Sequence, residues 1–285
     1  MKASVHWPRI AIVGVGLIGG SVGLAALSRR LAGRVVGVGR SAGSLAEAKR
    51  CGAVTETTTD LAAGVAEADL VVVATGVAAI PSLLDAIDAA VRPGTLITDA
   101  GSTKQSIVAH WEKRRRSRRG RFVGGHPIAG SHRRGPAAAD AKLFAGRVTV
   151  VTPTKATPAA DVEEAGGFWA ALGSTVFVMP PRQHDQLLAA TSHAPHVIAA
   201  AVAAATPPEA RQFTAGGWRD TTRIAAGDPE LWADILLDNA PLVAKALSRI
   251  AAATEKMLSA LEKADRKKLV SLLKAAKEDR DAVGS

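Results

Sequence analysis

The sequence predicts an α/β protein in which a Rossmann-type domain, built on a parallel sheet, is followed by an all-helical dimerisation domain. A glycine-rich turn near the N-terminus and an alternation of short apolar segments with Ala/Leu-rich segments indicate the first domain. Strand-like segments stop after Met179, and everything beyond has helical character. Short apolar strands separated by helices are typical of a parallel sheet covered on both faces. We therefore expect a dinucleotide-binding domain over residues 1–180 and a helical substrate and dimerisation domain over residues 181–285.

The elements can be placed by their apolar and β-branched residues. The predicted strands are 9–14, 34–39, 69–75, 95–100, 121–125, 147–152 and 175–179. The predicted helices include 77–90, 158–172, 182–205, 229–239, 241–262 and 265–279. Pro241 is expected to kink the chain or to open a new helix. From Glu230 to Glu262 the apolar positions recur at helical spacing over ~45–50 Å, at 1.5 Å per residue. A stripe of that length favours packing against a second copy, so we expect a homodimer.

Composition excludes several classes of protein. The single cysteine, Cys51, rules out a disulfide framework and a zinc site made of several thiolates, and it suits a reducing cytoplasm. The nearly uncharged segment from Ile10 to Ser28 could pass for an export signal or a membrane anchor. Its five glycines favour a strand, a tight turn and a helix instead. No other segment is expected to approach membrane-spanning length, so no membrane association is predicted.

Much of the net charge of +10 is local, because the segment from Trp111 to Arg121 carries seven basic residues in eleven. Such a run could bind nucleic acid or an acidic surface. No aromatic platform or recognition motif accompanies it, so we interpret it as the solvated end of a helix and the loop that follows. Its positive field would help to attract a dianionic substrate.

The segment GVGLIG follows the first strand and opens a helix, and it is predicted to bind the cofactor. In such a turn the first glycine, Gly14, allows a tight turn and the second, Gly16, lets the backbone approach a pyrophosphate. The third, Gly19, lets helix and strand pack closely, and Leu17 and Ile18 complete the predicted cofactor contacts. The alternative is a glycine-rich turn without a ligand.

The second strand bears on the choice between NAD⁺ and NADP⁺. NAD-binding sites usually place an acidic residue there to bind the ribose hydroxyl, whereas this strand ends in Arg40 and Ser41. Arg40 can pair with a 2′-phosphate and Ser41 can donate a hydrogen bond to it. We therefore expect NAD(P)⁺ as cofactor and favour NADP⁺, although Arg40 could stack on the adenine or lie in solvent instead.

Five blocks occur in order along the chain: GxGLIGGS, DAGSTK, GGHPIAGS, SHAPH and GGWRDTTRIA with DPELWADI. The residues of these five motifs and their order over residues 9–240 resemble those of the prephenate/arogenate dehydrogenase family of tyrosine biosynthesis. The resemblance implies a monofunctional NAD(P)-dependent enzyme that oxidises and decarboxylates a cyclohexadienol, prephenate or arogenate. We therefore expect neither a fused mutase nor a C-terminal regulatory domain.

The resemblance also implies roles for individual residues. His126 matches the general base that accepts the proton of the substrate hydroxyl as hydride leaves. The glycines beside it are expected to leave space for the substrate ring and the nicotinamide. Ser102 matches the serine that hydrogen-bonds this histidine and approaches the nicotinamide, although it could instead cap a helix. Arg223 matches the arginine that binds a substrate carboxylate.

Further positions match the substrate pocket of the family: His196, His193, Gly216 and Ser131. The pair His184-Asp185 is interpreted as structural. No metal is expected, because the histidines lack carboxylate or thiolate partners at ligand spacing.

The chain departs from the family pattern at three places, one of which is Ala194 of SHAPH, where relatives carry leucine. Relatives often carry an acid after HPIAG, whereas this chain has Ser131-His132-Arg133-Arg134, and the absence of that acid favours prephenate over arogenate. The third predicted strand ends in Thr75, assigned to the cofactor site, where a proline is common.

Two other classes of protein stay open. One is a β-hydroxyacid dehydrogenase or imine reductase, which would rely on a lysine in the second domain. The other is a dinucleotide-sensing or nucleic-acid-binding protein without enzymatic activity.

Overall fold

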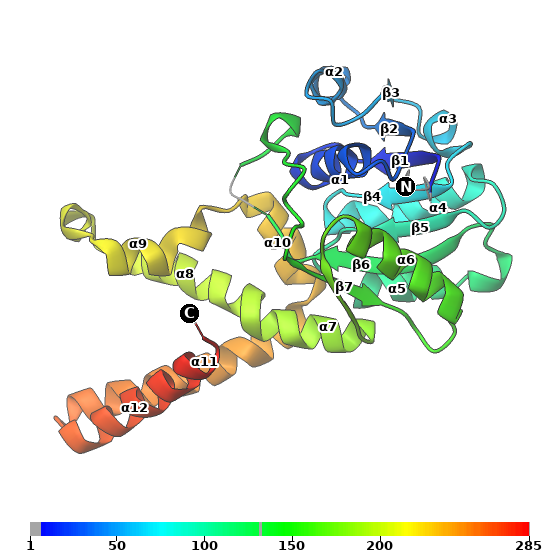
Figure 1. Ribbon diagram of the computed structural model, residues 1–285. Helices are drawn as coiled ribbons and strands as arrows, with labels where there is room; N and C mark the ends of the chain where they lie inside the picture. Colours follow the sequence, from blue (N-terminus) through cyan, green and yellow to red (C-terminus); the bar gives the residue numbers. More distant parts are fainter. Residues whose placement is uncertain (1–6, 131–132, 285) are drawn as a thin grey trace.

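The computed structural model describes residues 7–130 and 133–284 and shows a sheet domain from which a helical domain extends (Figure 1). The strands are β1 (Arg9–Val13), β2 (Arg34–Val38), β3 (Glu56–Thr58), β4 (Leu70–Val73), β5 (Leu96–Asp99), β6 (Arg121–Pro127), β7 (Val148–Thr152) and β8 (Thr175–Val178). They form one sheet of order β3-β2-β1-β4-β5-β6-β7-β8. All seven predicted strands are present. The strand β3 was not predicted from the sequence, because only three residues form it.

The sheet is not wholly parallel, contrary to the prediction. Neighbours pair parallel from β3 to β6, and β7 pairs parallel with β8, but β7 runs antiparallel to β6. The chain between β6 and β7 crosses back through loops and a short 3₁₀ turn, η3 (Pro136–Ala138), rather than through a crossover helix. Parallel neighbours need such a crossover, so β7 returns in the opposite direction.

Helices cover both faces of the sheet. Those of the sheet domain are α1 (Leu17–Ser28), α2 (Ala42–Arg50), α3 (Leu61–Val65), α4 (Ile80–Ala90), α5 (Gln105–Glu112) and α6 (Ala159–Ala171). Alternate strand residues face opposite layers. Ile10 and Ile12 of β1 pack with residues of α1, α2 and α6, whereas Ala11 and Val13 pack with residues of α3, α4 and α5. The result is a three-layer core with the strand ends free to form a site.

The chain beyond residue 180 is helical, as predicted. Its helices are α7 (Pro181–Leu188), α8 (Ala194–Ala205), α9 (Gly216–Thr222), α10 (Pro229–Asp238), α11 (Ala240–Glu262) and α12 (Arg266–Ala282). A π-helical turn, η4 (Ala189–His193), joins α7 to α8, and a 3₁₀ turn, η6 (Arg223–Ala226), follows α9. Inserted π turns change the direction of the following side chains and occur often at functional sites.

Two expectations for this domain need correction. The predicted stripe from Glu230 to Glu262 is not one rod, because α10 ends before Asn239 and α11 starts with Pro241 in its first turn. The stretch Pro181–Ala205 is long and apolar enough to cross a membrane, although no second segment of that kind was expected. The stretch comprises α7, η4 and α8, and the 182–205 helix predicted from the sequence already had this length. Two of its buried polar residues, His184 and Asp185, contact the sheet domain.

The basic run is partly structural. The side chain of Arg118 is only 5% exposed, lies 4.6 Å over the ring of Trp111 and pairs with Asp85 at 2.6 Å. Arg121 pairs with Asp161 at 2.6 Å and with Glu164 at 2.9 Å. Acidic residues of the sheet domain therefore neutralise part of this positive segment.

Candidate active site

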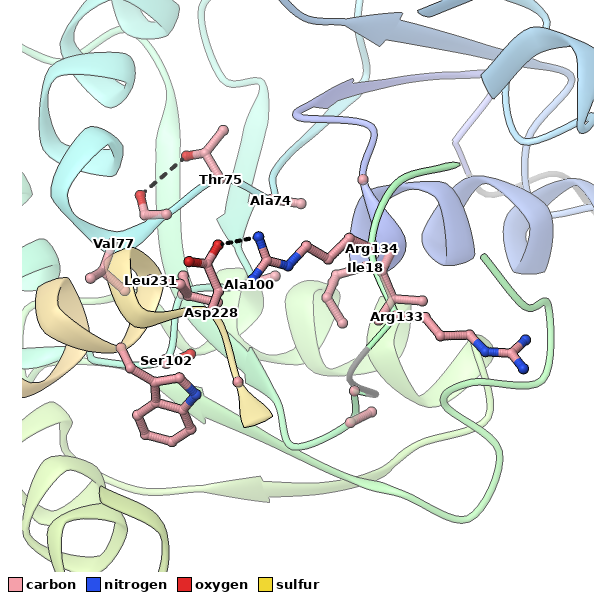
Figure 2. Close-up of a pocket in the computed structure, with 18 of the residues that line it drawn as sticks. Ile18, Ala74, Thr75, Val77, Ala100, Ser102, Arg133, Arg134, Asp228 and Leu231 are labelled. Carbon is pink, nitrogen blue, oxygen red and sulfur yellow. Dashed lines mark hydrogen bonds and ion pairs between the residues drawn. The ribbon is translucent and has the colours of Figure 1, made fainter. Parts of the chain in front are cut away.

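A cavity of about 410 Å³ lies where the sheet domain meets α10 (Figure 2). Its wall is formed by the turn after β1, the ends of β4 and β5, the loop after β6 and the start of α10. The residues labelled in Figure 2 are Ile18, Ala74, Thr75, Val77, Ala100, Ser102, Arg133, Arg134, Asp228 and Leu231. Open α/β sheets bind ligands beyond the carboxyl ends of their strands, and this cavity occupies that position.

The glycine turn between β1 and α1 fits a dinucleotide pyrophosphate. Gly14 has a φ of +95°, and a Cβ there would lie 2.6 Å from the carbonyl oxygen of Ala74. A Cβ on Gly19 would lie 2.0 Å from the carbonyl oxygen of Gly14. Gly16 caps α1 and has no described atom within 4 Å of its Cβ position. Protein packing therefore accounts for the first and third glycines, while the second faces open space at a helix N-terminus, where phosphates bind.

The other predicted cofactor residues differ in where they lie. Leu17, Ile18 and Thr75 line the cavity, and the Thr75 hydroxyl lies 3.4 Å from the carbonyl oxygen of Gly76. Arg40 and Ser41 are exposed, outside that lining, at the end of β2. Ser41 also caps α2.

His126 lies on β6 behind the cavity wall. It is 8% exposed and its side chain is not among those that line the cavity. Burial lowers the pKa of His126 well below its ordinary value, and repulsion from His184, Lys104 and His193 adds to the effect. The imidazole is therefore neutral at pH 7, the state that a general base needs.

The glycines beside His126 serve packing, which corrects the expectation that they leave space for the substrate. A Cβ on Gly124 would lie 2.5 Å from the hydroxyl of Thr152. A Cβ on Gly125 would lie 2.8 Å from the carbonyl oxygen of Asp99 and from the indole nitrogen of Trp169. Both positions are filled by the protein itself.

An ion pair between Asp99 and Lys104, both fully buried, supports the His126 backbone. The Lys104 ammonium donates to the carbonyl oxygen of Gly125 at 2.8 Å, and the Gly125 N–H donates to Asp99 Oδ1 at 3.0 Å. Burial lowers the pKa of Lys104, and Asp99 opposes that shift. The DAGSTK block thus fixes the strand on which His126 lies.

His184 contacts His126 and Asp185 contacts His184, an arrangement that was not predicted from the sequence. His126 Nδ1 lies 2.8 Å from His184 Nε2, and His184 Nδ1 lies 2.7 Å from Asp185 Oδ1. The Asp185 carboxylate also accepts the N–H groups of Lys104 and Gln105, each at 2.8 Å. It therefore caps α5, so Ser102 is not the cap of that helix. An adjacent His-Asp pair at the start of a helix was the available signal, but the sequence did not show which residue it faces.

Two more histidines of the helical domain lie near this group. His193 is 1% exposed and accepts a hydrogen bond from Asn239 Nδ2 at 3.1 Å, and burial lowers its pKa to about 4. His196 stacks on Trp232, with ring centroids 3.5 Å apart. Its Nδ1 is buried and has no partner among the described residues. Trp232 lines the cavity, so it connects these histidines to the wall.

The remaining predicted residues are only partly brought together. Ser102 is half-buried and lines the cavity. Gly216 on α9 and Arg223 on η6 are exposed and outside the cavity lining. Ser131 lies outside the described residues. In residues 7–130 and 133–284, no cluster of three His, Cys, Asp or Glu side chains is placed to hold a metal.

Charged side chains span the cavity between the two domains. Arg134, from the loop after β6, pairs with Asp228 at 2.8 Å, and Asp228 also caps α10 (Figure 2). Arg133 lines the cavity too but extends away from Asp228. The acidic side chain in this wall is therefore already engaged by an arginine.

Comparison with known proteins agrees with this arrangement. The chain is 34% identical over 281 residues to the prephenate dehydrogenase of Bacillus subtilis (strain 168), covering 96% of this chain and 76% of that protein. It is 32% identical to the cyclohexadienyl dehydrogenase of Zymomonas mobilis subsp. mobilis, covering 96% of this chain and 95% of that one. The structure of A. aeolicus prephenate dehydrogenase in complex with hydroxyphenyl propionate and NAD⁺ superposes with a TM-score of 0.88 at 29% identity, covering 96% and 98% of the two chains.

Two family models together match most of the chain. The nucleotide-binding domain of prephenate dehydrogenase matches residues 23–178, and the dimerization domain of prephenate dehydrogenase matches residues 180–275. The glycine turn lies just before the first match and completes a strand–turn–helix unit of the kind that binds nicotinamide dinucleotides. The chain belongs to the prephenate dehydrogenase family.

Proposed function

We propose that the protein catalyses the oxidative decarboxylation of prephenate, with hydride transfer to NAD(P)⁺. The observation that carries the proposal is a neutral, buried histidine, His126, held beside a cavity that also contains the dinucleotide turn and Ser102. The activities named for the relatives of this chain support the same reaction. The Rossmann domain, residues 1–180, is proposed to bind the cofactor, and residues 181–285 to complete the substrate site.

In the proposed reaction, His126 accepts the proton of the substrate 4-hydroxyl. A bound nicotinamide dinucleotide supplies the hydride acceptor for the hydrogen on the same carbon. The ring carboxylate then leaves as CO₂, and its bonding electrons complete the aromatic ring. Ser102 is proposed to orient the hydroxyl and His126. With the pKa of His126 lowered by burial, kcat/KM should stay level from pH 7 to below 6.5 before it falls.

Substrate contact with His126 requires the cavity wall to open, because the imidazole is 8% exposed. We assign that opening to α10, which carries Trp232 and is capped by Asp228. Its ion pair to the sheet domain involves Arg134, whose side chain is 64% exposed. Exposed pairs of this kind contribute about 0–1 kcal/mol, so the pair opposes opening only weakly.

The proposed substrate ligands come from both sides of the cavity. His193 and His196 are proposed to line the opened site, together with Ser131. Arg223 and Gly216 are retained as proposed carboxylate and backbone contacts, but they reach the substrate only if α9 and η6 move or a second copy presents them. The homodimer that would allow this is proposed to form through α11 and α12, which expose Leu258, Leu261 and Leu273 among other apolar side chains.

Prephenate is favoured over arogenate because Asp228, the acidic residue among the described residues that line the cavity, is already paired with an arginine. Arogenate carries an ammonium group, which needs a carboxylate partner. Asp228 is paired with Arg134, and Arg133 adds positive charge. NADP⁺ is favoured over NAD⁺ because Arg40 is exposed at the end of β2, where the ribose of a cofactor on the glycine turn would lie. A free exposed thiol at Cys51 suits the proposed cytoplasmic location.

A spectrophotometric assay tests the proposal. Reduced cofactor is followed at fixed enzyme concentration with prephenate and with arogenate, each with NAD⁺ and NADP⁺. We expect the highest kcat/KM with prephenate and NADP⁺, and a fall of about 10²–10⁴-fold in kcat for His126→Asn. Full activity of His126→Asn would contradict the base assignment. A preference for NAD⁺ that Arg40→Ala leaves unchanged would contradict the 2′-phosphate contact.

A further inference from the structure

Three side chains form one line of hydrogen bonds that ends at His126. Asp185 Oδ1 and His184 Nδ1 are 2.7 Å apart, and His184 Nε2 and His126 Nδ1 are 2.8 Å apart. Asp185 and His184 are at most 2% exposed, so water does not substitute for these contacts. In such a line, the nitrogen that carries hydrogen in one ring determines whether the neighbouring ring nitrogen must donate or accept.

The constraint starts at Asp185. Its carboxylate accepts the backbone N–H groups of Lys104 and Gln105 at 2.8 Å each, at the N-terminus of α5. An ionised carboxylate only accepts hydrogen bonds. Asp185 Oδ1 therefore requires a hydrogen on His184 Nδ1.

The next step passes through His184. Burial lowers its pKa, although Asp185 opposes the shift, so the ring is neutral and carries a single N–H. With that hydrogen on Nδ1, His184 Nε2 has only a lone pair and must accept. The group 2.8 Å away, His126 Nδ1, must then be the donor.

We propose that His184 and Asp185 are positioning residues, which hold His126 in the tautomer with hydrogen on Nδ1 and so leave Nε2 as the atom that accepts the substrate proton. The inference rests on the proposed function of His126 as the base. When Nε2 takes the hydroxyl proton, the O–H bond breaks and an N–H bond forms. The resulting imidazolium donates from Nδ1 to His184, whose own hydrogen bond to Asp185 places a carboxylate at the end of the line.

The other titratable groups around His126 do not supply this constraint. Lys104, before α5, directs its ammonium to Asp99 and the carbonyl oxygen of Gly125. His193, on η4, accepts from Asn239. Among the described contacts, His184 is the partner of His126 Nδ1, so the tautomer depends on it.

The test uses the full-length protein with ¹⁵N-labelled histidine rings and neither substrate nor cofactor. Two-bond ¹H–¹⁵N NMR correlations report which ring nitrogen carries hydrogen, and His126→Asn identifies the His126 signals among the seven histidines. We expect hydrogen on Nδ1 in the wild-type protein. In His184→Phe, which keeps a ring but removes the acceptor, we expect the hydrogen to move to Nε2.

Kinetics with prephenate give the second readout. His184→Phe should lose about 10²-fold or more in kcat with little change in KM, because the base atom is blocked. His184→Gln, whose side-chain oxygen can still accept from Nδ1, should restore much of kcat and the wild-type tautomer. The matched control is His110→Gln, since His110 contacts Asp85 at 3.0 Å on the protein surface away from the cavity. It should leave kcat and the His126 signals unchanged.

The outcomes separate this inference from the proposed function. Hydrogen on His126 Nε2 in the wild-type protein would overturn the inference, as would wild-type kcat in a folded His184→Phe. Absence of turnover by the wild-type protein would overturn the proposed function instead, and the NMR tautomer would still test the role of His184. Thermal unfolding of each variant identifies any that fails to fold. If His184→Phe does not fold, the tautomer of His126 in the wild-type protein decides, because hydrogen on Nε2 there overturns the inference and hydrogen on Nδ1 supports it.

Discussion

The ammonium of Lys104 and the carboxylate of Asp99 form a buried ion pair that holds Gly125, the residue before His126, from both its N–H and its C=O. Asp99 also accepts the N–H of Gly101 at 2.9 Å, next to Ser102. One charge pair thus connects the loop of the proposed serine with the strand of the proposed base.

Removing one partner of this pair should be strongly destabilising. Lys104→Met leaves the Asp99 carboxylate buried without its cation, which costs about 3–5 kcal/mol in comparable cases. The double variant Asp99→Asn/Lys104→Met removes both charges and should recover much of that loss. Urea unfolding followed by circular dichroism measures both. A Lys104→Met protein as stable as wild type would show that the pair does not support the strand.

The glycine beside the histidine offers a second test. In Gly125→Ala the new Cβ would lie 2.8 Å from the carbonyl oxygen of Asp99, a backbone atom, so β6 must shift. We expect a loss of about 1–3 kcal/mol in unfolding free energy, together with lower kcat. Gly130→Ala is the control, since no described atom lies within 4 Å of that Cβ position. It should change stability by no more than about 0.5 kcal/mol. If Gly125→Ala and Gly130→Ala were equally stable, Gly125 would not be required for packing, and its role would be to leave space for the substrate.

The sequence was sufficient to predict the elements that depend on local pattern. A short continuous run of apolar residues predicted β1, and the spacing of Gly14, Gly16 and Gly19 predicted the turn that follows it. The order of the five blocks also identified the family. These features are encoded within short segments, so a single sequence displays them.

What the sequence did not reveal depends on contacts between distant segments. The antiparallel β7, the packing role of Gly125 and the contact of His184 with His126 all join residues far apart in the chain. The short β3 is held by pairing with β2 and has little apolar pattern of its own. The placement of Arg223 outside the cavity likewise follows from the path of α9 and η6, which no local motif specifies.

Acid should destabilise the protein through its buried histidines. Burial lowers the pKa of His193 to about 4 in the folded state, against an ordinary value of 6.5. As the pH falls, His193 therefore takes up a proton in the unfolded state before it does so in the folded state. The contribution of His193 to the unfolding free energy is complete above pH 6.5 and is lost between pH 6.5 and 4. Because each pKa unit corresponds to about 1.36 kcal/mol, the unfolding free energy should fall by about 3 kcal/mol in total from this histidine.

Unfolding free energies measured from pH 7 to pH 4 check this prediction. His193→Gln should show a shallower decline than wild type over that window. If the unfolding free energy of His193→Gln declined with pH as steeply as that of the wild type, groups other than His193 would cause the loss of stability in acid.

The cofactor turn permits a matched pair of substitutions that separates binding from folding. Gly16→Ala meets no described atom within 4 Å and has a φ of −91°, so it should change stability by at most about 1 kcal/mol as a cap substitution. Its methyl group would stand where the pyrophosphate must approach the backbone, so the Kd for NAD(P)⁺ should rise.

Gly19→Ala places a Cβ 2.0 Å from the carbonyl oxygen of Gly14 and should cost about 1–3 kcal/mol in stability. Calorimetric titration of each variant with NAD⁺ and NADP⁺, beside thermal unfolding, distinguishes the two effects, and an unchanged Kd in Gly16→Ala would mean that the pyrophosphate does not lie on this turn.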